Sequence, residues 1–176
     1  KSMRMNELIN LLFEYVKLDS EGFHLDKKPL NLIELLRENA AMLYSDMEEN
    51  GMELVIDLPE MEWKVEADRL QMSRVVTNLL TNAMRHNDAG TTILVRADCE
   101  DDKARIVIAD NGKEIPPSVA GHLFEPFAMG DESRNSKGGS GLGLSIAAKI
   151  VAMHGWKLSL GNYPGYTKAF FIDISL

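Results

Sequence analysis

The sequence predicts an α/β fold, a two-layer sandwich of helices on a mixed, mostly antiparallel sheet. Three observations favour this class. Helical and β-rich segments are interleaved along the chain, two long β-rich runs are joined by the short acidic turn "EDD" as in a hairpin, and two further β-rich runs close the chain. Since there is no regular βαβ alternation, a doubly wound parallel fold fits less well.

The first element is an amphipathic helix over residues 3–17, whose apolar residues repeat at helical spacing. No capping residue precedes it, and the chain begins with Lys1 in mid-pattern, so we expect a helix cut from a longer protein. Residues 19–31 follow, with the helix-stopping Gly22 and then Pro29. They predict a linker that leads into a first edge strand.

The remaining elements follow from apolar spacing, capping residues and turn residues. In chain order we expect a helix at 32–49, strands at 52–58 and 63–68, a helix from a capping box formed by Asp68 and Gln71 to His86, strands at 91–99 and 103–110, a long loop at 111–143, a helix at 142–154 ended by Gly155, and strands at 156–162 and 166–175. Long loops in compact domains are usually functional or disordered.

Composition limits the classes of function. The chain has 176 residues, is 45% hydrophobic and has a net charge of -8, which suits one domain with a real core and argues against a chain-wide attraction to nucleic acid or anionic lipid. The single cysteine, Cys99, excludes an intramolecular disulfide and a zinc cluster and fits a reducing compartment. No apolar run approaches the ~20 residues of a membrane span, and no signal peptide is visible.

The segment "NLLTNAMRH" places two asparagines in a helix, although asparagine is a mediocre helix former. Asn78 and Asn82 lie about 40° apart on the helix, and Arg85 and His86 follow one turn later, so the four side chains form one polar strip. A carboxamide oxygen suits Mg²⁺, and Arg85 suits phosphate. The alternative is a pair of exposed or capping amides beside a solvated basic end.

Two glycine-containing segments offer further ligand groups. In "IADNGKEIP", Asp110 ends a strand before the turn at Asn111-Gly112, so its carboxylate could accept a hydrogen bond from an exocyclic amine such as that of adenine, or could satisfy its own turn. In "SKGGSGLGLSIA", four glycines crowd the start of a helix whose unpaired N–H groups favour phosphate. The alternative for this second segment is a flexible linker before the helix.

Together and in this order, these segments resemble the ATP-binding domain shared by sensor histidine kinases, DNA gyrase, the heat-shock chaperone ATPases and the mismatch-repair MutL proteins. "NLLTNAMRH" resembles the asparagine box, "DNGKEIP" the first glycine box, "LFEPF" the phenylalanine box of histidine kinases, "GGSGLGLSIA" the second glycine box and "GYTKAFF" the closing strand. The resemblance covers nearly the whole chain and implies a Bergerat-type sandwich with a flexible ATP lid.

The start of the chain extends the resemblance. "MNELINLLFEYVKLDSEGFHLDKKPLNLIELL" is similar to the second helix of the kinase dimerisation hairpin and its linker, which the gyrase-like and chaperone-like proteins lack. This implies the C-terminal part of that helix at residues 1–20, a linker and first edge strand at 21–30, and the catalytic ATP-binding domain at 31–176. An ordinary packing helix is the alternative for the first part.

The resemblance also implies a site for ATP and Mg²⁺. Asn82 would coordinate the metal, and the residues closest to phosphoryl transfer would be Asn78, Arg85 and Lys137. The nucleotide-binding residues would be Asn78, Asn82, Arg85, His86, Asp110, Gly112, Ile115, Lys137, Gly139, Gly141, Leu142, Gly143 and Thr167.

Each part of the nucleotide has an implied partner. Asp110 would accept a hydrogen bond from the adenine amine, with Gly112 leaving room and Thr167 helping through water. Ile115 would pack on the base, main-chain N–H groups of the second glycine box would wrap the triphosphate, and the two phenylalanines of "LFEPF" would anchor the lid.

Two features bear on the reaction. Hydrolysing relatives carry a glutamate at the position of Asn78, and an amide cannot act as a general base, so phosphoryl transfer to a protein acceptor is favoured. None of the four histidines fits the acceptor motif, so we expect the acceptor upstream of this chain. The implied function is the catalytic domain of a two-component sensor histidine kinase, located in the cytoplasm either as a cytoplasmic protein or as the cytoplasmic part of an inner-membrane sensor whose membrane segments lie outside this chain. Its partners would be its own upstream dimerisation and phosphoacceptor segment, a second copy in a homodimer, and a response regulator.

One departure from the pattern keeps other functions open. Glu114 stands where the first glycine box usually has its second glycine, and its bulk and negative charge predict weaker binding of an anionic ligand. The alternative from another class is a regulatory nucleotide-binding or docking module with weak or no kinase activity. A serine kinase of the anti-sigma type is a third, which the first helix and "LFEPF" disfavour.

Overall fold

The structure, a computed structural model, describes residues 2–128 and 141–176. Its helices are α1 (Ser2–Leu18), α2 (Leu32–Glu49), α3 (Arg69–His86), the short α4 (Pro117–Ala120) and α6 (Gly143–Met153). Its strands are β1 (Lys28–Asn31), β2 (Glu53–Asp57), β3 (Lys64–Ala67), β4 (Thr92–Glu100), β5 (Lys103–Asp110), β6 (Lys157–Gly161) and β7 (Lys168–Ser175). The helices and the strands from β2 onward agree with their predicted ranges to within two residues, and α4 lies inside the segment predicted as a loop.

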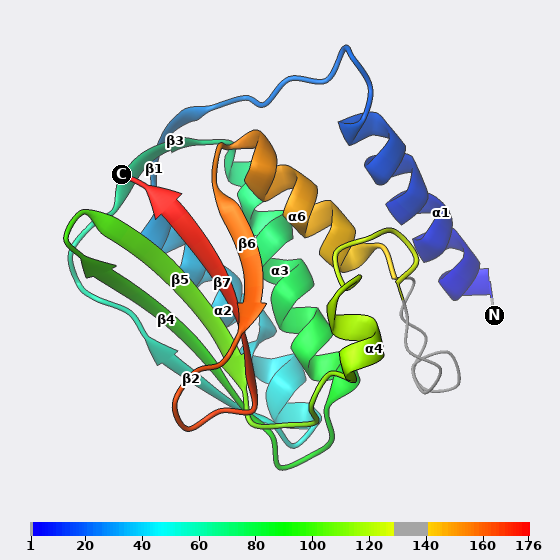
Figure 1. The fold of residues 1–176 in the computed structure, drawn as a ribbon, viewed down its shortest axis with the longest axis vertical. Coiled ribbons are helices and arrows are strands. Elements are labelled where there is room, and N and C mark those ends of the chain that lie inside the picture. The colour runs from blue at the N-terminus through cyan, green and yellow to red at the C-terminus, as the bar shows by residue number, and fades with distance from the viewer. Residues whose placement is uncertain (1, 129–140) are drawn as a thin grey trace.

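Five strands form one sheet in the order β2-β4-β5-β7-β6. β2 is parallel to β4, and the other three neighbouring pairs are antiparallel. The helices α2, α3 and α6 cover one face of this sheet (Figure 1). The prediction of a two-layer sandwich with a mixed, mostly antiparallel sheet is therefore confirmed.

The strand predicted at the entry to the domain does not join this sheet. β1 pairs with β3 in a separate antiparallel ribbon. Asn31, the last residue of β1, caps α2: its Oδ1 accepts hydrogen bonds from the main-chain N–H groups of Ile33 and Trp63, both at 3.2 Å. One amide thus begins α2 and fixes the segment that leads into β3.

Alternation along β5 and β7 decides which side chains face the helices. Ile106 and Ile108 belong to the main core beneath the helices, whereas Val107 belongs to a smaller apolar cluster on the opposite face. Asp110 continues the first set, because successive side chains of a strand alternate. Lys168 is paired with Asp110 in the register of β5 and β7. Both residues are therefore directed toward the helix layer.

The start of α3 agrees only in part with the predicted capping box. Oδ1 of Asp68 accepts the predicted hydrogen bond from the main-chain N–H of Gln71 at 3.1 Å. The N–H of Asp68, which a full capping box would pair with Gln71, donates instead to Nε2 of His154 at 3.0 Å. Nδ1 of His154 is 2.8 Å from the carbonyl of Ile150, so the proton of the neutral ring is on Nδ1.

α1 lies along one side of the molecule, next to α6 (Figure 1). Arg74 of α3 donates to Glu14 of α1 at 2.8 Å, and Lys149 of α6 pairs with Asp19 just beyond α1. The large apolar residues that α1 leaves exposed are Met5, Leu8, Ile9, Leu12, Phe13 and Val16. A contiguous apolar face of this kind usually marks an interaction surface. Among the described residues, none of the helices has both the length and the apolar character needed to cross a membrane.

Candidate functional site

The polar strip predicted on α3 is present, and its two asparagines differ in their contacts. Asn78 is half-buried, and its Nδ2 donates to the carbonyl of Gly143 at 3.1 Å, which joins α3 to the start of α6. Asn82 is also half-buried, but within the described residues its carboxamide has no hydrogen-bond partner. Arg85 and His86 lie exposed at the end of the helix. The oxygen of Asn82 is thus available to a ligand.

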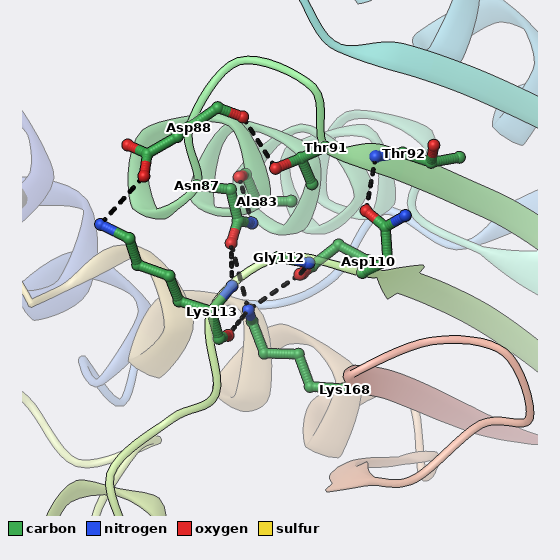
Figure 2. Close-up of polar contacts among 10 residues, drawn as sticks. Ala83, Asn87, Asp88, Thr91, Thr92, Asp110, Gly112, Lys113 and Lys168 are labelled. Atoms are coloured by element: carbon green, nitrogen blue, oxygen red, sulfur yellow. Dashed lines mark hydrogen bonds and ion pairs between the residues drawn. The ribbon is translucent and has the colours of Figure 1, made fainter.

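The end of β5 lies beside the end of α3, as Figure 2 shows. Asp110 and Lys168 are only 3% and 7% exposed. Nζ of Lys168 donates to Oδ1 of Asp110 at 2.8 Å, and the same oxygen accepts the main-chain N–H of Gly112 at 3.0 Å. The carboxylate predicted to recognise a base is therefore already paired with a buried lysine.

Asn87, directly after α3, connects that helix to the segment after β5 (Figure 2). It is 1% exposed, and its Nδ2 donates to the carbonyl of Ala83 at 2.7 Å. Its Oδ1 accepts from the N–H of Lys113 at 3.0 Å and from Nζ of Lys168 at 3.3 Å. A Cβ on Gly112 would lie 1.9 Å from this oxygen. The room that Gly112 leaves is therefore occupied by the Asn87 side chain.

The surroundings of His86 also place it near this network. Desolvation of the imidazole lowers the pKa of His86 below the ordinary value of 6.5. It does so although the residue as a whole is exposed. The positive charges of Lys168 and Arg85 lower the pKa further, and the carboxylate of Asp110 opposes them. His86 is therefore neutral near pH 7 and adds no positive charge beside Asp110.

The second glycine segment forms the entry to α6. Gly141 has a φ of +73°, which a glycine adopts without steric cost, and its carbonyl accepts a hydrogen bond from the N–H of Phe127 at 3.0 Å. Leu142 is fully buried and stands at the N-cap position of α6, and Gly143 is the first residue of that helix. Since Asn78 binds the carbonyl of Gly143, the N–H groups of this helix start lie close to the polar strip.

The other predicted site residues lie in different surroundings. Lys137 and Gly139, with most of the predicted lid, fall outside the described residues. Ile115 is half-buried and packs against the main core. The main-chain N–H of Thr167 donates to the carbonyl of Asp110 at 2.9 Å, but the side chain that reaches the carboxylate is that of the next residue, Lys168.

The two phenylalanines of "LFEPF" differ. Phe124 packs edge-on against Phe170 of β7, with ring centroids 6.1 Å apart, as expected of an anchor. Phe127 is 56% exposed and has a φ of +62°. The predicted lid lies mostly outside the described residues, so an anchoring role of Phe127 there stays a prediction.

The donor set at α3 is suited to a magnesium ion that is shared with phosphates. Within residues 2–128 and 141–176, no cluster of His, Cys, Asp and Glu side chains could hold a metal by itself. An ion at Asn82 would need phosphate and water oxygens beside the carboxamide, which is the usual manner of Mg²⁺ binding next to nucleotides. The neighbouring Arg85 is suited to the phosphates.

The sequence-based prediction missed Lys168 and Asn87. A signal for Lys168 did exist: in a strand that includes Phe170 and Ile172, alternation places Lys168 on the buried face, where an unpaired lysine is rare. No comparable signal marked Asn87, because its burial depends on Gly112, which is remote in sequence.

Residues 67–176 match the family model described as "Histidine kinase-, DNA gyrase B-, and HSP90-like ATPase". The chain belongs to this ATPase family. The matched range contains α3, the ends of β5 and β7 and the start of α6, and thus the described residues of the candidate site. The family resemblance inferred from the five sequence segments is therefore confirmed.

Curated relatives include sensor kinases. The alginate biosynthesis sensor protein KinB of Pseudomonas aeruginosa is 32% identical over 169 residues, which are 96% of this chain and 28% of that protein. The probable sensor histidine kinase TcrY of Mycobacterium tuberculosis is 33% identical over 168 residues, 94% of this chain and 34% of that protein. The chain thus spans about a third or less of the length of these two relatives.

Solved structures, a histidine kinase among them, share the fold. Full-length ShkA, in complex with AMPPNP, superposes with a TM-score of 0.79 at 25% identity and covers 96% of this chain and 35% of that one. The histidine kinase ThkA, in complex with the response regulator TrrA, gives a TM-score of 0.77 at 25% identity, over 98% of this chain and 47% of that one. Both similarities extend over almost the whole chain.

Proposed function

We propose that the chain is the ATP-binding catalytic domain of a two-component sensor histidine kinase, which transfers the γ-phosphate of ATP to a histidine upstream of this chain. The observation that carries the proposal is the meeting of three distant segments on the helix side of the sheet. These are the polar strip with Asn82, the start of α6 at Gly143, and the end of β5 at Asp110. Membership of the ATPase family and the sensor-kinase relatives support it.

α3 would hold the phosphate end of the nucleotide. The Asn82 carboxamide would coordinate Mg²⁺, which when bound would neutralise phosphate charge. Arg85 would contact the phosphates, and the N–H groups at the start of α6 would bind them as well. Lys137, outside the described residues, is the further cation proposed for the γ-phosphate.

Asn78 favours transfer over hydrolysis. Its amide cannot remove a proton from water, and it donates to Gly143, so its proposed role is to position the start of α6. A site built in this way accelerates the reaction chiefly by positioning and by stabilising charge.

The exposed apolar side of α1 is proposed as half of the dimerisation hairpin. On this assignment residues 1–20 belong to the hairpin, residues 21–30 form the linker and residues 31–176 form the catalytic domain. The acceptor histidine would lie in the preceding segment. A second copy and a response regulator would be partners of the full-length protein, and the domain would act in the cytoplasm.

Titration of a non-hydrolysable ATP analogue in the presence of Mg²⁺ tests the proposal. We expect saturable one-to-one binding that Asn82→Ala, or chelation of the metal, weakens by about tenfold or more, the effect of losing one interaction with a charged group. Asn10→Ala is the matched control, because Asn10 is exposed on α1. Binding that is insensitive to both Mg²⁺ and Asn82→Ala would contradict the proposed site.

A phosphotransfer assay addresses the reaction. The isolated chain should not label itself with radioactive ATP, but should label a separately supplied upstream segment that carries the acceptor histidine. Nucleotide binding without such transfer would favour the alternative, a regulatory nucleotide-binding module. The pairing of Lys168 with Asp110 is the observation that favours this alternative.

A further inference from the structure

Lys168 directs its full hydrogen-bonding capacity into the region around Asp110. An ammonium group has three donors, and the structure gives Lys168 three acceptors: Oδ1 of Asp110, Oδ1 of Asn87 and the carbonyl of Lys113 (Figure 2). The residue is 7% exposed. A buried lysine with three acceptors is a fixed part of the structure, because the ammonium group could leave its place only by breaking all three hydrogen bonds.

The same contacts reduce what Asp110 can offer to a base. Its Oδ1 already accepts from Lys168 and from the N–H of Gly112, and its charge is compensated by the ammonium group. Of the two carboxylate oxygens of Asp110, Oδ2 is the one without a hydrogen-bond partner within the described residues. A neutral exocyclic amine gains most from a carboxylate whose negative charge is unpaired, since hydrogen bonds to an ionised acceptor are the strong ones.

We propose that Lys168 is a specificity-determining residue that keeps Asp110 from selecting adenine, so that the site holds nucleoside triphosphates chiefly by their phosphates and distinguishes ATP poorly from GTP. This inference rests on the proposed function, because it concerns the same nucleotide site. In the wild-type chain, the dissociation constants of Mg·ATP and Mg·GTP should agree within about threefold, less than the effect of one good hydrogen bond to a charged group.

Lys168→Thr tests the inference directly. Threonine is too short to make the three contacts of Lys168, so the Asp110 carboxylate becomes available to the adenine amine. The affinity for Mg·ATP should rise about tenfold, while the affinity for Mg·GTP should not rise, because the carbonyl of guanine offers no donor to the carboxylate. Lys157→Thr is the matched control: Lys157 is exposed at the start of β6, and its substitution should change neither affinity.

Asp110→Asn completes a double-mutant cycle. In the wild-type background it should change Mg·ATP affinity by less than about twofold, since Lys168 already occupies the carboxylate. In the Lys168→Thr background it should remove the gain in affinity. A purely structural role of either residue would not produce this dependence on the background.

An unchanged ratio of ATP to GTP affinity in folded Lys168→Thr would overturn the inference. So would a loss of about tenfold or more in Mg·ATP affinity on Asp110→Asn in the wild-type background. Lys168→Thr leaves Asp110 buried without its partner and could fail to fold for that reason. In that case the Mg·ATP affinity of Asp110→Asn in the wild-type background decides alone. Equal ATP binding by wild type and Lys168→Thr would overturn only this inference. If neither folded chain binds either nucleotide with Mg²⁺, the proposed function fails as well.

Discussion

Gly112→Ala should destabilise the fold by removing Asn87 from its place. The new Cβ would lie 1.9 Å from Oδ1 and 2.3 Å from Cγ of Asn87, so the amide must rotate away. It would lose its hydrogen bonds with Ala83, Lys113 and Lys168. At about 1 kcal/mol for each bond, the free energy of unfolding should fall by about 3 kcal/mol.

Urea unfolding and thermal melting measure this effect. For a domain of this size, about 3 kcal/mol corresponds to a melting temperature lower by about 6–12 °C. Gly121→Ala is the matched control, because Gly121 has a φ of -70° and no atom within 4 Å of an added Cβ. Equal stability of the two variants would refute the role given to Gly112 and Asn87.

Three further outcomes are expected. Burial lowers the pKa of His154, so the stability due to its neutral ring is present above about pH 6.5 and is lost as the pH falls below that value. Urea unfolding at several pH values should show that this residue changes the free energy of unfolding by at most about 1.4 kcal/mol per pH unit. The variant His154→Gln should remove this pH dependence. Asn78→Ala should cost about 1 kcal/mol in urea unfolding through the lost bond to Gly143, and no loss would argue against this link between α3 and α6. Gly155→Ala should lower the free energy of unfolding by about 1 kcal/mol from backbone strain alone, since φ is +78° and no atom lies within 4 Å of the new Cβ. If melting experiments show the same loss of stability for Gly155→Ala and Gly121→Ala, this strain is excluded.

The elements were predictable because their signals are local. α3 is set by the cap at Asp68 and by apolar residues at helical spacing, and β5 is set by a β-rich run that ends at a turn. The reciprocal half of the capping box was not predictable, because His154, far along the chain, takes the N–H of Asp68. The pairing of β1 with β3 depends likewise on contacts across the chain.

The site was predictable as a set of motifs, but its contacts were not. Asn78, Asn82 and Asp110 stand out by residue type and position. The lysine beside Asp110 follows from the register between β5 and β7, which no single segment encodes. The burial of Asn87 requires the missing side chain of Gly112. These non-local contacts set how the carboxylate of Asp110 can act.

On the proposed function, the polar strip of α3, the end of β5 and the start of α6 bind one nucleotide together. Amide hydrogen exchange, measured with and without a non-hydrolysable ATP analogue and Mg²⁺, tests it most directly. We expect slower exchange together at residues 82–87, 110–113 and 141–145. Protection of only one of these segments, or of none at saturating analogue, would contradict a shared site.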